Sequence, residues 1–262
     1  MGNTERRFSL RSETPLVVAH RGASATHPEN TLAAFEAAIT AGAEFVEFDV
    51  RITSDGVPVV MHDADVSRTT DGSGLVRELT LEQVKRLTVR GAGPAAAVPT
   101  LRETFDALDG RVGADVEIKN LPMDADYEPD GEPSVDATLR EASASGFSSP
   151  LVISSFSLRS IRRAKAAAPE VPTGLLVIDT LPCSEALEIV VADGHSFVLP
   201  SADAVEREGV SFLSRAHDQG VRVAAWTVDN PGRAAALFRL GIDALATNDP
   251  AAIVPIRDAE TQ

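Results

Sequence analysis

Short apolar runs alternate with alanine-rich amphipathic stretches along the chain. The apolar runs predict β-strands at residues 16–20, 45–53, 57–63, 113–120, 151–156, 173–178, 196–200, 221–228 and 243–248. The amphipathic stretches predict helices at residues 30–42, 79–87, 100–110, 134–145, 158–168, 183–194, 210–220 and 231–241. This alternation favours parallel strands closed into a (β/α)8 TIM barrel over an open α/β sheet. The absence of a Gly-x-Gly-x-x-Gly motif after the first strand also counts against an open dinucleotide-binding sheet.

One stretch, residues 64–98, interrupts the alternation. It contains the turn-rich sequence SRTTDGSG and the loop VRGAGPAAAVP on either side of a short predicted helix. We expect a small cap segment, inserted after the second strand and its hairpin partner, on top of an otherwise regular barrel. No Pro, Gly or Ser tract is long enough to be a linker, so residues 1–262 are predicted to form a single domain.

The composition argues against several classes of binding partner. Acidic residues outnumber Lys and Arg by 39 to 24, and the formal net charge of -15 disfavours nucleic acids and anionic membrane surfaces. No apolar run approaches the ~18 residues of a membrane span, and the polar stretch 1–15 lacks the apolar core of a signal peptide. The single cysteine, Cys183, excludes an internal disulfide and is expected to be a structural thiol. We therefore expect a cytoplasmic protein without stable membrane association.

Carboxylates occur within segments that otherwise have the composition of buried strands. In FVEFDV (45–50), Glu47 and Asp49 alternate with apolar residues, so both point to the same face of the strand. In DVEIKN (115–120), Glu117 and Lys119 share a face in the same way. In a barrel we expect that face to be the interior. Enzymes with this barrel fold have their active sites at the carboxyl ends of the strands.

Buried carboxylates need a positive partner, because desolvating an unpaired ion is costly. Glu47, Asp49 and Glu117 supply only oxygen ligands, which suit a hard divalent cation, Mg²⁺ or Ca²⁺, better than zinc. The simpler alternative is a metal-free network of ion pairs with Lys119. Pairing with one lysine would leave carboxylates in excess, so the sequence favours a metal site.

Two histidines end predicted strands near this cluster. His20 closes the first strand directly before Arg21, and His62 ends the strand at 57–63. Imidazole titrates near neutral pH, so two histidines beside acids and an arginine predict a general acid and a general base. The remaining histidines are expected on the surface or in loops: His27, His195 and His217.

Three nearby features have simpler interpretations. Asn30 or Thr31 can cap the helix that follows, and Asn30 is interpreted as no more than such a cap. Asp63 either orients His62 or belongs to a turn, and the sequence does not decide between these. The acidic stretch 123–133 is interpreted as a solvated loop.

The ordered set of motifs resembles the signature of the glycerophosphodiester phosphodiesterase family. Residues 20–63 contain HRG, PENT, ExD and HD in that order. The similarity extends to VEIK at 116–119, AWTV at 225–228 and DALATNDP at 243–250, and so spans nearly the whole chain. A lone ExD or HD would mean little, whereas the ordered set is specific. Asn248 stands where many relatives carry Asp.

The resemblance implies a metal-dependent barrel that hydrolyses glycerophosphodiesters, such as glycerophosphocholine or glycerophosphoethanolamine, to an alcohol and glycerol 3-phosphate. It implies one divalent cation, Mg²⁺ or Ca²⁺, held by Glu47, Asp49 and Glu117, and it implies His20 and His62 as the acid–base pair. Three further positions are implied to contact the substrate: Arg21 and Lys119 at the phosphate, and Trp226 in the pocket. Trp226 is also compatible with plain barrel packing. The segment 64–98 occupies the place of the small cap in that family.

Other functions remain open at this point. A phospholipase-type phosphodiesterase, of the phosphatidylinositol phospholipase C or sphingomyelinase D kind, has similar histidines and acids but must meet membranes. A glycoside hydrolase would use paired carboxylates without requiring the histidines and cations around them. A non-catalytic barrel that binds a metal or a phosphodiester would carry the same ligands without the chemistry. The sequence does not indicate the headgroup, the ion, the division of roles between the histidines or the oligomeric state.

Overall fold

The computed structural model describes residues 14–91, 96–128 and 130–261, and within them the sheet has nine strands. Their bounds are β1 Leu16–His20, β2 Phe45–Ile52, β3 Pro58–Val60, β4 Gly113–Ile118, β5 Leu151–Ser155, β6 Thr173–Leu176, β7 Phe197–Leu199, β8 Arg222–Ala225 and β9 Ala244–Thr247. The sheet closes on itself because β1 pairs in parallel with both β2 and β9. All strands except β3 run parallel around the closure, which confirms the predicted (β/α)8 barrel.

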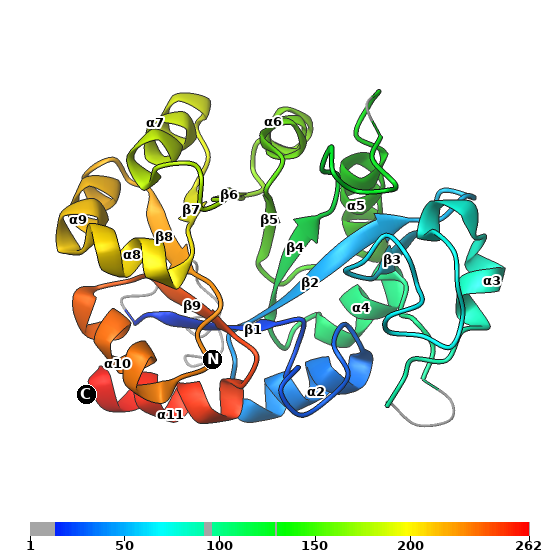
Figure 1. Ribbon diagram of the computed structural model, residues 1–262, viewed down its shortest axis with the longest axis horizontal. Helices are drawn as coiled ribbons and strands as arrows, with labels where there is room; N and C mark the ends of the chain where they lie inside the picture. The colour runs from blue at the N-terminus through cyan, green and yellow to red at the C-terminus, as the bar shows by residue number, and fades with distance from the viewer. Residues whose placement is uncertain (1–13, 92–95, 129, 262) are drawn as a thin grey trace.

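Helices surround this sheet (Figure 1). Their bounds are α2 Leu32–Ala41, α3 Leu81–Lys85, α4 Leu101–Leu108, α5 Pro133–Ser145, α6 Leu158–Ala167, α7 Cys183–Asp193, α8 Ala202–Glu208, α9 Val210–Asp218, α10 Pro231–Leu240 and α11 Pro250–Glu260. The sequence pattern missed α8 and α11. The first is short and is followed directly by Gly209, and the second contains Pro255, a residue that argues against a helix in a sequence alone. None of the helices in the described part of the chain is long and apolar enough to cross a membrane.

The two faces of β2 separate apolar from charged side chains, as the alternation predicts. Phe48 points outward and packs between Phe35 of α2 and Phe105 of α4, with ring centroids 5.7 and 6.4 Å apart. Glu47 and Asp49 point the other way, into the barrel, where both are buried. Apolar packing on the outer face therefore fixes the orientation of the inner acids.

The lower part of the barrel interior is filled by apolar side chains. These residues form one cluster: Leu16, Val18, Phe45, Val152, Phe197, Leu199, Ala224 and Ala244. Polar and charged side chains take over toward the carboxyl ends of the strands. The barrel thus has an apolar base and a polar upper end, the arrangement in which catalytic groups are normally found.

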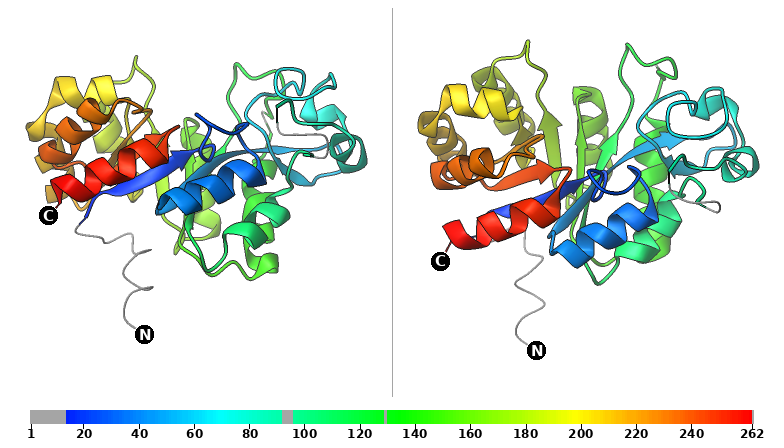
Figure 2. Two further views of the ribbon diagram at one scale, coloured as in Figure 1. Left: turned by 90° about the horizontal axis from the view of Figure 1, so that it is seen from below. Right: turned by 60° about the horizontal axis from the view of Figure 1, so that its bottom comes forward.

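The segment 64–98 leaves the barrel after the β2–β3 hairpin, as predicted (Figure 2). β3 is shorter than the predicted strand, so His62 lies in the loop that follows it. The segment contains α3 and a 3₁₀ turn at Val76–Glu78, and it builds a small apolar core of its own with β3. Residues 92–95 of the predicted cap, and residues 1–13 of the polar N-terminal stretch, lie outside the described residues.

Candidate active site

Strand register brings the three predicted metal ligands together. Asp49 of β2 lies opposite Glu117 of β4, and Glu47 lies beside His20 of β1. Oxygen atoms of Glu47, Asp49 and Glu117 lie within 4.8 Å of one another, and all three residues are buried. The carboxylates therefore converge on one point inside the barrel.

Burial and mutual repulsion shift the acidity of this cluster. Burial raises the pKa of Glu47 well above its usual value, and the neighbouring Asp49 and Glu117 raise it further. Burial likewise raises the pKa of Glu117 to about 7. Burial opposes ionisation of Asp49 too, but Lys119 and Arg21 hold its pKa below the usual range. The cluster contains more carboxylate than its two cations neutralise.

Arg21 and Lys119 contact the acids from opposite sides. The backbone N–H of Arg21, a residue with φ of 55°, donates to Glu47 Oε2 at 2.9 Å. Its guanidinium Nε lies 3.3 Å from Asp49 Oδ2. Lys119 Nζ lies 2.9 Å from Asp49 Oδ1 and also pairs with Glu117. Glu47 Oε1 nevertheless has no hydrogen-bond partner among the described residues. An all-oxygen set with an unpartnered buried oxygen fits a hard divalent cation better than a closed ion-pair network.

The partner of His20 fixes which of its nitrogens is free. His20 Nδ1 lies 2.8 Å from Asn248 Oδ1, while Asn248 Nδ2 donates to Asp229 at 2.7 Å. Because an ionised carboxylate only accepts, the amide oxygen of Asn248 must face His20, and His20 Nδ1 must donate. Burial lowers the pKa of His20, which favours the neutral ring with its lone pair on Nε2.

His62 has a different partner. Its Nδ1 lies 2.6 Å from a carboxylate oxygen of Asp63, so Asp63 orients His62, which was one of the two interpretations left open. Asp63 is held in turn by Arg68 of the cap segment, which also donates to Glu29. Burial lowers the pKa of His62, although the negative charges of Asp49 and Asp63 oppose that shift. A carboxylate partner stabilises the imidazolium form more than an amide does.

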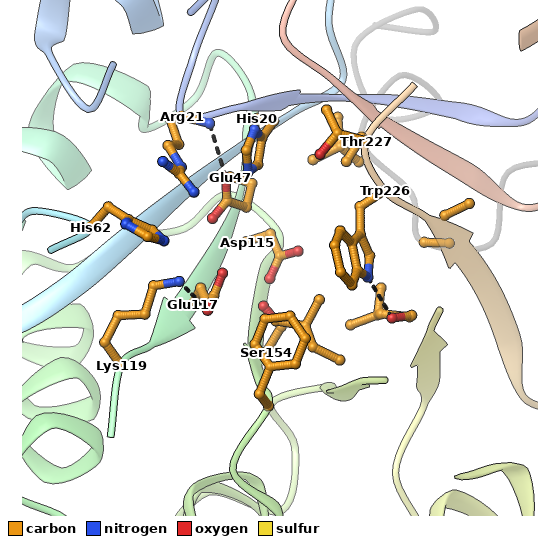
Figure 3. Close-up of a pocket in the computed structure, with 17 residues that line it drawn as sticks. His20, Arg21, Glu47, His62, Asp115, Glu117, Lys119, Ser154, Trp226 and Thr227 are labelled. Carbon is orange, nitrogen blue, oxygen red and sulfur yellow. Dashed lines mark hydrogen bonds and ion pairs between the residues drawn. The ribbon is translucent and has the colours of Figure 1, made fainter. Parts of the chain in front are cut away.

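A cavity of about 300 Å³ opens between these groups and Trp226 (Figure 3). The charged side chains line one side, and the opposite side is apolar. That apolar side is lined by Phe156, Leu176, Leu199, Ala224, Ala225, Trp226 and Ala246. Trp226 donates from Nε1 to the carbonyl of Leu199 at 2.7 Å, and its ring meets Phe156 edge-on at 5.5 Å. Trp226 therefore lines the predicted pocket and also packs against the barrel wall.

Two amides contact site residues in ways that sequence reasoning missed. Asn30, with φ of 57°, is buried and donates from Nδ2 to Asp49 Oδ2 at 2.8 Å. The interpretation of Asn30 as a cap was wrong, because the side chain of Thr31, the other capping candidate, caps α2. Asn248, which carried little weight in the sequence, contacts His20. An amide beside a helix or a turn has the same local signal as a cap, so only the fold distinguishes these roles.

Two other expectations hold only in part. His195 lies in the loop between α7 and β7, as expected, but its side chain is buried, with Nδ1 2.7 Å from Thr173 Oγ1 at the base of the barrel. The acidic stretch 123–133 is not only a solvated loop, because Asp124 and Asp126 form ion pairs with the buried Arg51. Cys183 is buried and free, as expected of a structural thiol.

The model of the glycerophosphoryl diester phosphodiesterase family matches residues 20–252. The chain is 34% identical to the glycerophosphodiester phosphodiesterase of Caldanaerobacter subterraneus subsp. tengcongensis over 251 residues, 91% of this chain and 96% of that protein. It is 30% identical to the glycerophosphodiester phosphodiesterase of Bacillus subtilis over 253 residues, 90% of this chain and 84% of that protein. A solved Oleispira antarctica phosphodiesterase, in complex with the product sn-glycerol-3-phosphate, superposes with a TM-score of 0.82 and 30% identity, covering 94% of this chain and 97% of that chain.

Proposed function

Because the chain belongs to the glycerophosphoryl diester phosphodiesterase family, we propose that it hydrolyses glycerophosphodiesters to an alcohol and glycerol 3-phosphate. Glycerophosphocholine and glycerophosphoethanolamine are the proposed substrates. The observation that carries the proposal is the convergence of Glu47, Asp49 and Glu117 beside two cations and two histidines in one cavity. The product bound by the Oleispira relative supports the same substrate class.

The charge balance supports a divalent cation and an anionic substrate together. Three carboxylates around one divalent ion leave about one net negative charge, by the ligand preferences of hard cations. A phosphodiester adds another, so Arg21 and Lys119 are proposed to hold the phosphate oxygens. Arginine offers a fork of two donors, and lysine adds a compact charge. When bound, Mg²⁺ or Ca²⁺ would polarise the phosphoryl group and compensate its developing charge.

We assign His20 as the general base and His62 as the general acid. Asn248 holds His20 with a neutral amide, leaving Nε2 free to accept a proton from the attacking hydroxyl. Asp63 holds His62 with a carboxylate, which favours the protonated ring that donates to the leaving oxygen. In this scheme the glycerol 2-hydroxyl attacks phosphorus and the headgroup alcohol leaves with the proton of His62. Water then opens the cyclic glycerol phosphate to glycerol 3-phosphate.

The test is product formation from glycerophosphocholine. The purified protein is incubated with Mg²⁺ or Ca²⁺, with and without an excess of chelator, and glycerol 3-phosphate is measured enzymatically. We expect product with the metal and loss of at least 90% of the rate with the chelator. Cleavage of phosphatidylinositol or sphingomyelin in its place would assign the site to a phospholipase-type enzyme. Metal binding without any product would indicate a binding barrel.

We further propose that the protein works in the cytoplasm on small molecules, without nucleic-acid or stable membrane partners. The formal net charge of -15 supports this, because such a surface repels polyanions and anionic lipids.

A further inference from the structure

Asp115 is a half-buried acid inside the barrel that the proposed chemistry does not use. It lies on β4 opposite Glu47 and two residues before Glu117, so alternation turns its side chain to the same inner face. Two strand residues span roughly 7 Å, which places Asp115 about that much deeper in the barrel than the acid of Glu117. Figure 3 shows its carboxylate pointing into the cavity between the charged residues and Trp226.

The surroundings of Asp115 give no structural reason for a carboxylate. A second, smaller space of about 30 Å³ lies below it, and every other described residue that lines this space is apolar. Ser154 gives Asp115 one side-chain hydrogen bond. Its Oδ1 atom is buried and has no partner among the described residues. An unpartnered buried oxygen is destabilising, so a carboxylate at this position points to a ligand that completes its hydrogen bonding.

We propose that Asp115 accepts a hydrogen bond from the glycerol hydroxyl that does not attack phosphorus, and so selects a glycerol arm in the substrate. The inference rests on the proposed function, which puts the phosphate beside Arg21 and Lys119 at the upper end of the cavity. The three-carbon arm then extends toward the base, along the apolar side formed by residues such as Leu199 and Trp226. Its terminal hydroxyl then meets Asp115, whose Oδ1 has no partner among the described residues.

The test compares glycerophosphocholine with propane-1,2-diol 1-phosphocholine, which keeps the attacking hydroxyl and lacks the terminal one. We expect the wild-type protein to prefer glycerophosphocholine by about 100-fold in kcat/KM, because a site built for a hydroxyl rejects its absence. Asp115→Leu removes the acceptor while keeping the branched shape of the side chain, and should reduce that preference to within about threefold. Asp115→Asn keeps one acceptor oxygen and should retain an intermediate preference.

A binding measurement separates this inference from the proposed function. Calorimetry with glycerol 3-phosphate and propane-1,2-diol 1-phosphate should show the same preference in the wild-type protein and its loss in Asp115→Leu, even if turnover of both diesters fails. Equal loss of both substrates in Asp115→Leu, or no preference in the wild-type protein, overturns the inference. A tenfold weaker Mg²⁺ midpoint for Asp115→Asn without substrate also overturns it, because Asp115 would then belong to the metal ligands.

Discussion

Two buried charged clusters differ in how their acids are satisfied. The lower cluster is the pair Glu44 and Arg257, and the upper cluster holds Glu47, Asp49 and Glu117. At the base of the barrel Glu44 accepts the Val17 N–H at 2.9 Å and pairs with Arg257 of α11 at 2.8 Å. Both carboxylate oxygens of Glu44 therefore have partners. At the upper end, Glu47 keeps an oxygen without a partner among the described residues, beside two further carboxylates.

The difference separates a structural role from a functional one. A closed ion pair ties α11 to the start of β2 and leaves no charge for a ligand. Breaking such a pair is costly, because the remaining charge is stranded in a low-dielectric interior. An open cluster with excess negative charge gains from a cation that the chain itself does not supply. The lower cluster should therefore govern stability, and the upper one should govern activity.

The largest effect is expected from a substitution that breaks the upper cluster. Glu117→Gln should lower kcat/KM for glycerophosphocholine by about 1,000-fold, since several kcal/mol of charge stabilisation depend on the metal site. The free energy of unfolding without metal should stay equal or rise, because a like-charge repulsion is removed. Saturation with Mg²⁺ at 100 times the dissociation constant should stabilise the wild-type protein by about 2.7 kcal/mol. Glu117→Gln should not be stabilised in this way, so Mg²⁺ should leave its denaturation midpoint unchanged. If Glu117→Gln unfolds readily but keeps its activity, the upper cluster governs stability rather than activity.

A second test concerns His62, the proposed proton donor beside the upper cluster. His62→Ala should lower the rate on glycerophosphocholine by roughly 100- to 1,000-fold, the range for loss of a general acid. A glycerol phosphodiester with a nitrophenyl leaving group needs no proton, so its rate should fall less than tenfold. His20→Ala provides the matched control, because loss of the base should slow both substrates alike. Equal losses for His62→Ala on both substrates would remove the acid role from His62.

The lower cluster is tested by removing Arg257, which leaves the charge of Glu44 without its partner. Arg257→Ala leaves Glu44 buried with one backbone donor, which should cost about 3 kcal/mol of stability. For a chain of this size that corresponds to a loss of roughly 6–12 °C in Tm. Activity at a temperature where the variant is folded should remain within about twofold. The double variant Glu44→Leu with Arg257→Leu should recover part of the loss, because no unpaired charge remains. A collapse of activity in the folded single variant would show that the two clusters are coupled.

The comparison also shows what the sequence can predict. Alternation in β2 and β4 gives the face of each acid, and the order of motifs gives their common site. The register that sets Asp49 against Glu117 has no local signal, because it depends on packing against helices elsewhere in the chain. Asp115 was within reach of the sequence, since it continues the spacing of Lys119 and Glu117 by two residues.

Contacts between distant residues explain the remaining misses. Asn248 reaches His20 across 228 residues, and Asn30 reaches Asp49 across 19. His195 lies between α7 and β7 without a periodic pattern, so nothing local indicates that it is buried. Each of these polar side chains gained its role from a partner that only the closed barrel brings near.

Substitution of Asn30 is expected to have the smallest effect. It tests how the carboxylates of the upper cluster are oriented. Its amide donates to Asp49 Oδ2 and so orients a proposed metal ligand. Loss of such an outer contact typically lowers metal affinity by about 10- to 100-fold. Asn30→Gly should show that loss in Mg²⁺ titrations followed by thermal denaturation, with kcat at saturating Mg²⁺ within about threefold of wild type.

Asn30→Ala is the matched control, because Asn30 has φ of 57° and alanine is strained there while glycine is not. Both variants should lose metal affinity to the same extent, since both lack the amide. Only Asn30→Ala should lose a further 1 kcal/mol or so of stability, from the left-handed backbone. If Asn30→Gly binds Mg²⁺ as tightly as the wild-type protein, the amide shapes only the loop, and Asp49 is held by Lys119 and Arg21 alone.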